Sequence, residues 1–221
     1  MSCYSAKELI LMGKTVITAH SGCEDTPENS IEHIRAAFAS GAEMLEVDLR
    51  MAPDGTLYLS HDVPEDITQR PLLKELLELV AKEKNVGINL DAKTEGLVSA
   101  AMEQVRAYGL TDRVIFTGSC THERALAVSL GSEVWHNLEE GESIAHGLDF
   151  FLQAGSPYLN VSYRLINDET NAQLRGLGRG FSAWTVNDEE NLRRYLRMGV
   201  VNITTRKPVL AMKLRKEIQG I

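Results

Sequence analysis

Cysteine is scarce in this 221-residue sequence, and its three cysteines lie far apart. Cys3, Cys23 and Cys120 show neither the paired spacing of a zinc site nor the framework of a disulfide-rich domain. This scarcity favours a reducing, cytoplasmic setting. Cys23 follows His20 by three residues, but no partner that would activate a cysteine nucleophile is evident in the sequence.

Long apolar runs are also missing. No segment approaches the roughly 18 consecutive apolar residues that a membrane-spanning helix needs. The short apolar run from Leu9 to Met12 lacks the basic leader and the long apolar stretch of a signal peptide. We therefore expect no transmembrane helix and no stable association with a membrane.

Positive charge is in deficit. The chain has 23 Lys and Arg residues against 31 Asp and Glu residues, a formal net charge of −8. An acidic chain without a basic run is a poor partner for nucleic acid or for an anionic membrane surface. These features favour a small-molecule substrate and exclude no oligomeric state.

Linkers and low-complexity tracts are absent as well. Hydrophobic residues make up 43% of the chain, which is an ordinary share for a globular protein with a sizeable core. The sequence therefore predicts one domain spanning residues 1–221.

A repeated unit runs through the chain, in which a helical stretch ends in glycine and a short strand follows. Glycine is the usual residue just after a helix, and strands that alternate with helices form parallel sheets. The predicted helices are residues 29–41, 96–109, 122–131, 143–155, 167–178 and 188–199. The predicted strands are residues 16–20, 44–50, 87–93, 114–118, 133–137, 158–163, 181–187 and 200–205.

Eight strands linked by helices in about 220 residues predict a compact α/β fold, the (β/α)8 TIM barrel. An open doubly wound sheet is the alternative. It rarely needs eight strands linked by helices, and no GxGxxG motif follows the first strand. At the start of the first predicted helix, we expect Asn29 to be the N-cap, with Glu32 completing a capping-box pair.

Charged residues alternate with apolar ones in two of the strands. Glu46 and Asp48 alternate with leucine and valine, and Asp91 and Lys93 alternate with apolar residues in the next strand. Side chains alternate between the two faces of a strand, so the charged set should point into the barrel. Carboxylates there are costly unless they are paired or bound to a metal ion. Inward polar groups near the carboxyl ends of barrel strands usually mark a site.

The three carboxylates form an oxygen-rich set that suits a hard cation, Mg²⁺ or Ca²⁺, better than zinc. Lys93 has the charge to hold a phosphate group. His20 ends the first strand and His61 ends the extension after the second, so this pair is a candidate for acid–base catalysis. Trp184, at the end of the seventh strand, is a candidate either for stacking on a substrate or for barrel packing.

Each of these residues also has an interpretation without a catalytic role. A lone histidine at a strand end is usually structural or merely exposed, and motifs are hypotheses. Glu46 and Asp48 could simply pair with Arg50 and Lys93 in a network inside the barrel. The convergence of all these groups on neighbouring strands favours a catalytic site.

The sequence resembles the glycerophosphodiester phosphodiesterases in the order and register of its motifs, from residue 16 to about residue 208. The stretch from His20 to His61 is the specific part of the resemblance. The matching motifs are His20-Ser21-Gly22, Glu28-Asn29-Ser30, Gly41-Ala42-Glu43, Glu46-x-Asp48, Asp54-Gly55, His61-Asp62, Asp91-x-Lys93 and Trp184-Thr185-Val186-Asn187.

The resemblance implies metal-dependent hydrolysis of a glycerophosphodiester-like substrate to an alcohol and a phosphomonoester, a reaction of lipid metabolism. It implies His20 and His61 as the catalytic pair, with Lys93 near the phosphate. The divalent cation would be held by Glu46, Asp48 and Asp91. Two other functions stay open: a non-catalytic barrel that binds a phosphorylated ligand, and a lyase that forms a cyclic phosphate.

The chain departs from the family pattern at several positions. Ser21 stands where the family has an arginine, which removes a bidentate phosphate donor. Arg164 and Arg206, after the sixth and eighth strands, are the candidates to replace it. Asp91 is one methylene shorter than the family's glutamate.

Two stretches depart from the pattern as well. Residues 62–90 leave room for about one helix where the family usually inserts a small subdomain, which predicts a wider and less covered mouth. The last strand ends in Ile203-Thr204-Thr205, where the family often has an aspartate.

Overall fold

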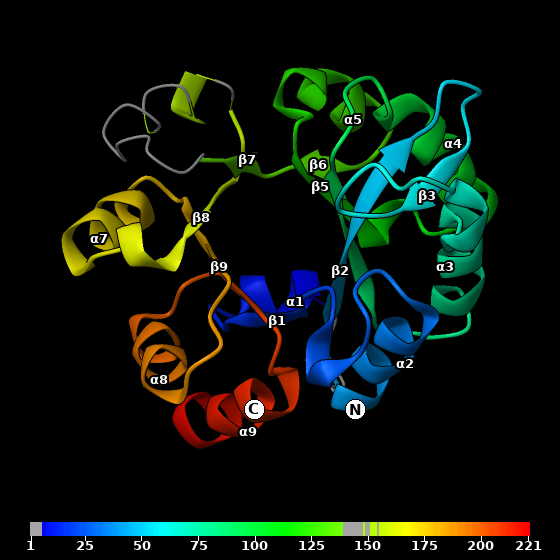
Figure 1. Ribbon diagram of the computed structural model, residues 1–221. Coiled ribbons are helices and arrows are strands. Elements are labelled where there is room, and N and C mark those ends of the chain that lie inside the picture. Colours follow the sequence, from blue (N-terminus) through cyan, green and yellow to red (C-terminus); the bar gives the residue numbers. More distant parts are fainter. Residues whose placement is uncertain (1–5, 139–147, 149–150, 154) are drawn as a thin grey trace.

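The computed structural model describes residues 6–138, 148, 151–153 and 155–221 (Figure 1). The predicted helix at residues 143–155 lies largely outside the described residues. The described helices are α1 (Ala6–Leu11), α2 (Ile31–Ser40), α3 (Leu73–Val80), α4 (Val98–Ala107), α5 (Arg124–Ser129), α7 (Asp168–Gly176), α8 (Glu189–Met198) and α9 (Pro208–Gln219).

Ten strands of the described residues form one sheet. They are β1 (Val16–Ala19), β2 (Met44–Met51), β3 (Leu57–Leu59), β4 (Gly87–Ala92), β5 (Val114–Gly118), β6 (Glu133–Val134), β7 (His136–Asn137), β8 (Tyr158–Ser162), β9 (Gly180–Trp184) and β10 (Asn202–Thr205). Their order is β6-β5-β4-β2-β1-β10-β9-β8-β7, and all paired neighbours along this path are parallel. β3 pairs with β2 in antiparallel fashion outside the ring.

The two ends of this path, β6 and β7, are separated only by Trp135. The backbone N–H of Trp135 donates to the carbonyl of Phe116 at 2.9 Å, and its buried ring packs edge-on against Tyr158, with ring centroids 5.1 Å apart. The fifth predicted strand is therefore split, because β6 pairs with β5 and β7 pairs with β8. The chain itself completes the ring, and the predicted (β/α)8 barrel is confirmed (Figure 1).

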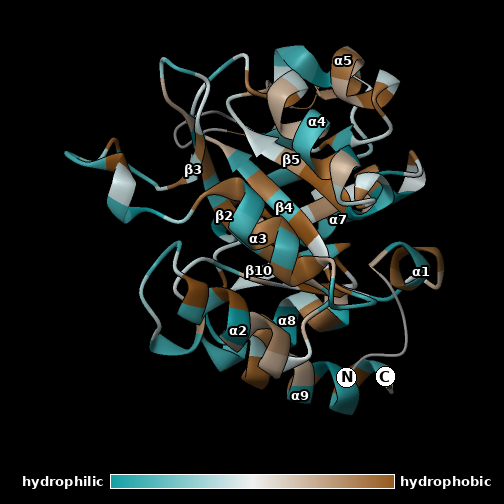
Figure 2. Cartoon of the chain, turned by 90° about the vertical axis from the view of Figure 1, so that its right-hand side faces the viewer, coloured by the Kyte–Doolittle hydropathy of each residue, from teal (hydrophilic) through white to brown (hydrophobic). Residues whose placement is uncertain are grey.

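The hydrophobic core lies between the strands and the helices that surround them. Leu45, Val47 and Leu49 of β2 are fully buried and join the main cluster with apolar residues of the helices. Figure 2 shows hydrophobic and hydrophilic bands alternating along β2 and β4, and hydrophilic colouring on the outer face of α3. Because side chains alternate along a strand, this outward apolar set leaves Glu46 and Asp48 on the inner face, as predicted.

The segment between His61 and β4 contains a single 3-10 turn at Ile67–Gln69 and the helix α3. The expectation of about one helix there is therefore correct. No described helix is long and apolar enough to cross a membrane.

One short helix was not predicted. In α1, Leu9 is fully buried against Val16, Met44 and Trp135. The helix lies behind the ring in the view of Figure 1 and covers the barrel at the end where its strands begin. Its six residues are too few to show a helical period, so only the burial of Leu9 identifies it.

A buried ion pair ties the last helix to the same end of the barrel. The Arg215 guanidinium on α9 contacts both carboxylate oxygens of Glu43, at 2.6 and 2.8 Å, and also donates to the Thr15 carbonyl at 2.9 Å. Glu43 Oε2 in turn accepts from the backbone N–H of Ile17 at 3.1 Å. Both side chains of the pair are almost completely buried, so neither can be hydrated if the other is lost.

We expect Arg215→Met to lower the free energy of unfolding by about 3–5 kcal/mol, because it leaves the Glu43 carboxylate buried without its partner. Urea denaturation measures this loss. The matched control is Arg193→Met on α8, whose ion pairs with Glu189 and Glu217 are exposed to solvent and should contribute much less to stability. Equal losses in the two variants would contradict a structural role for the buried pair.

Candidate functional site

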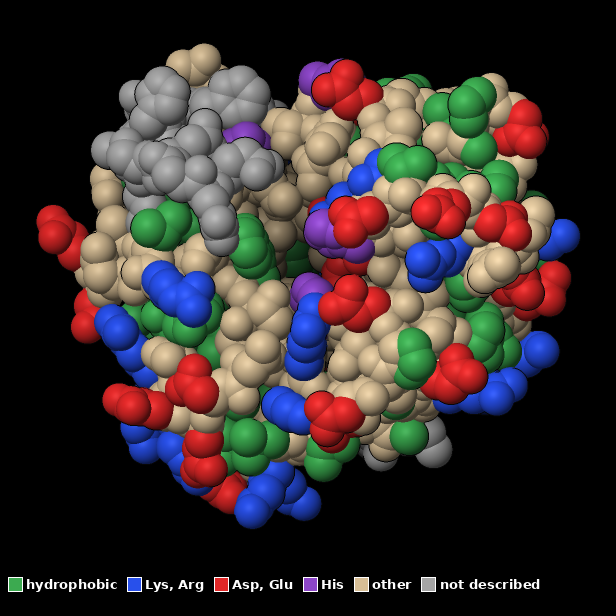
Figure 3. All heavy atoms as spheres, viewed as in Figure 1, with side chains coloured by type: hydrophobic (Ala, Val, Ile, Leu, Met, Phe, Trp, Pro, Cys, Tyr) green, Lys and Arg blue, Asp and Glu red, His purple; other side chains and the backbone are tan. Residues whose placement is uncertain are grey.

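One cavity of about 750 Å³ opens at the carboxyl ends of the barrel strands. All seven residues predicted for the site line it: His20, Glu46, Asp48, His61, Asp91, Lys93 and Trp184. The space-filling view down the barrel shows a hollow in this face, with histidine, acidic and basic side chains around it (Figure 3). The fold therefore brings together residues that are up to 164 positions apart in the sequence.

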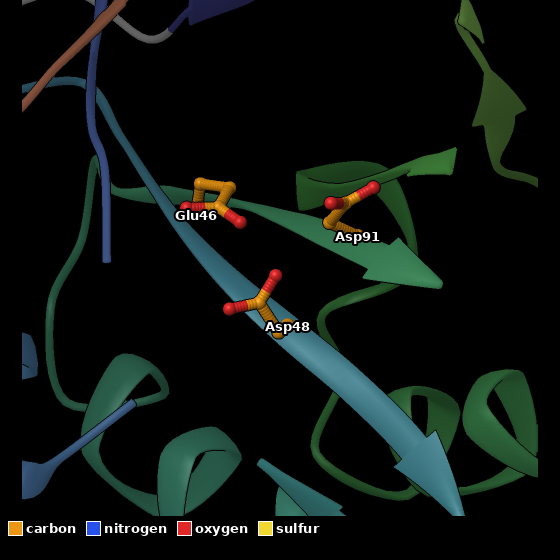
Figure 4. Close-up of side chains that lie close together, drawn as sticks. All are labelled: Glu46, Asp48 and Asp91. Carbon is orange, nitrogen blue, oxygen red and sulfur yellow. The ribbon is translucent and has the colours of Figure 1, made fainter. Parts of the chain in front are cut away.

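Three carboxylates face one another inside this cavity (Figure 4). Glu46, Asp48 and Asp91 each offer an oxygen, and these oxygens all lie within 4.8 Å of one another. The parallel register of β2 and β4 explains the arrangement, because it places Asp48 opposite Asp91. Glu46 lies two residues before Asp48 and so shares its face of the sheet.

Each carboxylate accepts a hydrogen bond from an uncharged group that fixes its orientation. Glu46 Oε2 accepts from the backbone N–H of Ser21 at 2.9 Å. Asp48 Oδ2 accepts from the Asn29 side chain at 2.7 Å, and Asp91 Oδ1 accepts from the Thr117 hydroxyl at 3.0 Å. The three acids are thus held in place by groups on β5 and on the segment that leads from β1 to α2.

The expected role of Asn29 as a helix cap is wrong. Ser30 is the N-cap of α2, and its hydroxyl accepts from the backbone N–H of His33 at 3.0 Å. Asn29 has a positive φ of 54°, and its side chain bridges Asp48 by donating to the carboxylate and accepting from the backbone N–H at 2.9 Å. The Asn29 side chain therefore positions Asp48 through two hydrogen bonds and does not cap the helix.

Lys93 partly neutralises the acidic cluster. Its ammonium lies 2.6 Å from Asp91 Oδ2 and 3.1 Å from Asp48 Oδ1. Burial opposes the charged form of this lysine, but the two carboxylates outweigh it and raise the pKa of Lys93. The pairing of Asp48 with Lys93, which the interpretation without a catalytic role expects, is therefore present. Arg50 instead donates to the backbone carbonyl of His61 at 2.6 and 2.9 Å.

The cluster keeps an excess of negative charge, because three carboxylates face one ammonium. Burial, with the neighbouring charges of Asp48 and Asp91, raises the pKa of Glu46 well above its usual value. Close carboxylate oxygens without sulfur or nitrogen ligands are the donor set of a hard divalent cation. The three acids therefore fit such an ion.

His20 follows β1 at the edge of this cluster. Its backbone N–H donates to the Thr205 carbonyl at 2.8 Å, and its Nδ1 lies 2.8 Å from the Ser21 carbonyl. Because a carbonyl oxygen can only accept, we assign the hydrogen to Nδ1, which leaves a lone pair on Nε2. Burial is the main cause that lowers the pKa of His20 and favours this neutral form.

His61 lies on the rim of the cavity. It follows β3, and the two hydrogen bonds from Arg50 fix its backbone. Its Nδ1 is 3.0 Å from Asp62 Oδ1, and its side chain is 61% exposed. The two histidines thus reach the same cavity from different environments, one enclosed and one open to solvent.

Sequence reasoning did not single out several polar residues of the cavity. The signal for two of them was present, since Asn160 alternates with apolar neighbours in its strand and Asn89 does so in β4. Of the two candidate arginines, Arg206 lines the cavity, whereas Arg164 lies over the ring of Tyr163, 4.8 Å from its centroid. The polar lining residues that were missed are Asn89, Thr117, Ser119, Asn137 and Asn160.

Cys23 does not take part in the site. Its side chain is fully buried, and it is not among the residues that line the cavity. Burial is the main cause that raises the pKa of the Cys23 thiol to about 12. The thiol therefore stays protonated at neutral pH and is a poor nucleophile.

Comparisons with known proteins point to one family. The model of the glycerophosphoryl diester phosphodiesterase family matches residues 20–70, which include both histidines. A glycerophosphodiester phosphodiesterase from Bacillus altitudinis is 26% identical, and the match covers 93% of this chain and 100% of that protein.

Solved structures show the same fold. A phosphodiesterase from Oleispira antarctica, in complex with the product sn-glycerol-3-phosphate, matches with a TM-score of 0.79 and 16% identity over 93% of this chain and 98% of its own. A glycerophosphodiester phosphodiesterase from Parabacteroides distasonis matches with a TM-score of 0.75 and 21% identity over 94% of this chain and 98% of its own.

A third histidine lies behind the acidic cluster. His33 on α2 is fully buried, and its Nε2 lies 3.1 Å from the backbone carbonyl of Glu46. Burial is the main cause that lowers the pKa of His33 to about 4. Since the unfolded chain protonates this histidine near the ordinary histidine pKa of about 6.5, the folded state binds fewer protons between these two values.

We therefore expect the free energy of unfolding to fall as the pH drops from 6.5 towards 4. Between pH 7 and pH 5, His33 should account for a loss of about 2 kcal/mol. Urea denaturation at both pH values measures this loss. The variant His33→Gln should abolish the contribution of His33, because glutamine keeps a side-chain donor but cannot titrate. The control His122→Gln changes an exposed histidine and should retain the loss. An unchanged pH dependence in His33→Gln would contradict the assignment.

Proposed function

The chain is a divergent member of the glycerophosphodiester phosphodiesterase family, and on that premise we propose that it hydrolyses a glycerophosphodiester-like substrate to an alcohol and a phosphomonoester. The observation that carries this proposal is the meeting of two histidines and three carboxylates in one cavity at the carboxyl ends of the barrel strands. Active sites of TIM-barrel enzymes lie at this end of the fold.

The charge of the cavity supports a divalent cation, Mg²⁺ or Ca²⁺. Among the described lining residues, four carboxylates face the two permanent cations Lys93 and Arg206, which leaves two negative charges in excess. Glu46, Asp48 and Asp91 would hold the ion. When bound, it would neutralise phosphoryl oxygens and stabilise the charge that develops during displacement.

Hydrolysis requires two proton transfers, which we assign to the two histidines. Water adds across the P–O bond, so the entering oxygen loses a proton and the leaving alcohol oxygen gains one. His20 can accept a proton at Nε2, because its Nδ1 hydrogen is directed at the Ser21 carbonyl. His61, on the rim, is the second group that exchanges a proton with the reacting oxygens.

Lys93 and Trp184 would contact the substrate. The Lys93 ammonium, next to Asp48 and Asp91, can approach a phosphate oxygen held over the acidic cluster. Trp184 ends β9 on the other side of the cavity, where its ring can cover an apolar part of the substrate. The cytoplasmic setting, the role in lipid metabolism, the single domain over residues 1–221 and the lack of nucleic-acid or membrane partners stay predictions from the sequence.

Replacement of either histidine should abolish turnover. We expect His20→Asn and His61→Asn each to reduce the hydrolysis of glycerophosphodiesters by about 10²–10⁴-fold, the usual contribution of general acid–base catalysis. Circular dichroism and the urea midpoint check that both variants fold. Activity within tenfold of the wild type would refute the acid–base assignment. Analysis of the wild-type product separates hydrolysis from a lyase reaction, which would give a cyclic phosphate.

Loss of one carboxylate should weaken the divalent site. Because removal of a group that merely supports a metal ligand typically costs 10–100-fold in affinity, we expect Glu46→Gln to weaken Mg²⁺ or Ca²⁺ binding by at least about tenfold. Titration calorimetry measures the affinity. Glu32→Gln removes an exposed acid of α2 and serves as the control of equal charge change. Equal affinities for Glu46→Gln and the wild type would rule out Glu46 as a ligand.

A further inference from the structure

Two described side chains with a permanent positive charge line the cavity, and they are placed differently. Lys93 is already engaged with Asp48 and Asp91. Arg206 follows β10 and lies beside the first histidine instead, with its Nε 3.4 Å from His20 Nδ1. The guanidinium of Arg206 is therefore the cation next to the proton-transfer group rather than within the acidic cluster.

Ser21, the residue after His20, cannot bind phosphate as the Arg206 guanidinium can. Ser21 is fully buried, and its hydroxyl accepts from the backbone N–H of Asn29 at 2.7 Å. Its own backbone N–H donates to Glu46. The hydroxyl oxygen and the backbone N–H of Ser21 thus both contact the scaffold, and Ser21 carries no cationic donor.

The backbone of Arg206 is fixed from two sides. Its N–H donates to the Asn187 side-chain oxygen at 2.8 Å, and its carbonyl accepts from the N–H of Glu24 at 2.9 Å. The side chain itself is 43% exposed. The backbone of Arg206 is therefore held in place while its guanidinium remains accessible from the cavity. This lowers the loss of conformational entropy when an anion binds.

The guanidinium already has a partner in the segment between β1 and α2, which would compete with a bound phosphate. Arg206 Nη2 forms an ion pair with Glu28 Oε1, and the Glu28 side chain is 48% exposed. An ion pair this open to water is weak. A phosphate group offers the planar guanidinium two charge-assisted hydrogen bonds, so it can displace a single exposed carboxylate.

We propose that Arg206 binds the phosphate group of the substrate beside His20, and that Glu28 occupies its guanidinium when phosphate is absent. Arg206 thereby supplies, from the end of β10, the guanidinium that the end of β1 lacks. This role rests on the proposed function, since it assigns a phosphate ligand to the same cavity. It also makes Glu28 a residue that sets affinity for the substrate.

The test measures binding of sn-glycerol 3-phosphate by calorimetry at saturating Mg²⁺, together with kcat and KM for a glycerophosphodiester. Arg206→Met should weaken binding and raise KM by about 10–100-fold, as expected for the loss of a bidentate charge-assisted contact. Arg206→Lys should restore only part of the affinity, because an ammonium cannot form the planar fork. The matched control is Arg164→Met, which removes the arginine outside the cavity and should bind as the wild type does.

Glu28→Gln tests the competitor. It should tighten binding a few-fold in the wild-type background and have no effect in the Arg206→Met background, because the two residues act as a pair. A tightening that persists without Arg206 would overturn the role of Glu28. Binding by Arg206→Met within twofold of the wild type would overturn the role of Arg206.

The outcomes also separate this inference from the proposed function. If the wild type hydrolyses the diester while Arg206→Met binds and reacts equally well, the inference fails and the function stands. If the wild type hydrolyses no diester, the function fails, and the calorimetric comparison of wild type and Arg206→Met still decides whether Arg206 binds phosphate. A wild type that binds neither glycerol phosphate nor inorganic phosphate overturns the inference.

Discussion

Repulsion among three enclosed carboxylates is the constraint around which this end of the barrel is built. Two like charges about 4 Å apart repel by about 4 kcal/mol at the effective dielectric of a protein surface. A hydrogen bond to a charged group returns about 1.5–3 kcal/mol. One such bond to each acid, with a single ammonium between two of them, leaves part of the repulsion unbalanced. A bound divalent cation would remove this imbalance. The cluster would therefore be more stable with the ion bound than without it.

The same constraint shapes the turn between β1 and α2. Asn29 adopts a left-handed conformation, which a non-glycine residue takes only at some cost, and its side chain reaches Asp48. The backbone N–H of Ser21 is committed to Glu46, and His33 contacts the Glu46 carbonyl from the helix side. A larger cationic side chain at position 21 would disturb this scaffold. The neighbouring strand end offers an alternative, because β10 pairs with β1 and its end lies beside that of β1.

The repeat of helices and strands predicted the barrel, and strand alternation predicted the acidic cluster, because period-two patterns report which face a side chain occupies. The alternation rule would also have found Asn160. The capping rule failed for Asn29, since a polar residue before a helix fits a local cap as well as a distant bridge. The sequence could not choose between Arg164 and Arg206, because the direction of a side chain after a strand depends on the loop that follows. The helix α1 was missed because six residues contain too little periodicity.

The far side of the barrel interior is polar but neutral, in contrast to the acidic side. A chain of hydrogen bonds runs across the strands from Thr18 through Asn202, Ser182 and Asn160 to Asn137, with distances of 2.6–3.0 Å. Each buried amide and hydroxyl in this chain has a partner, so the network is rigid and carries no net charge. Asn137 and Asn160 also line the cavity. A substrate whose phosphate lies over the charged side would therefore place its alcohol against neutral amides. These amides can bind hydroxyl groups but cannot neutralise a charge. Under the proposed function, recognition of the phosphate and recognition of the alcohol would be separated across the barrel, so that a change of one need not disturb the other.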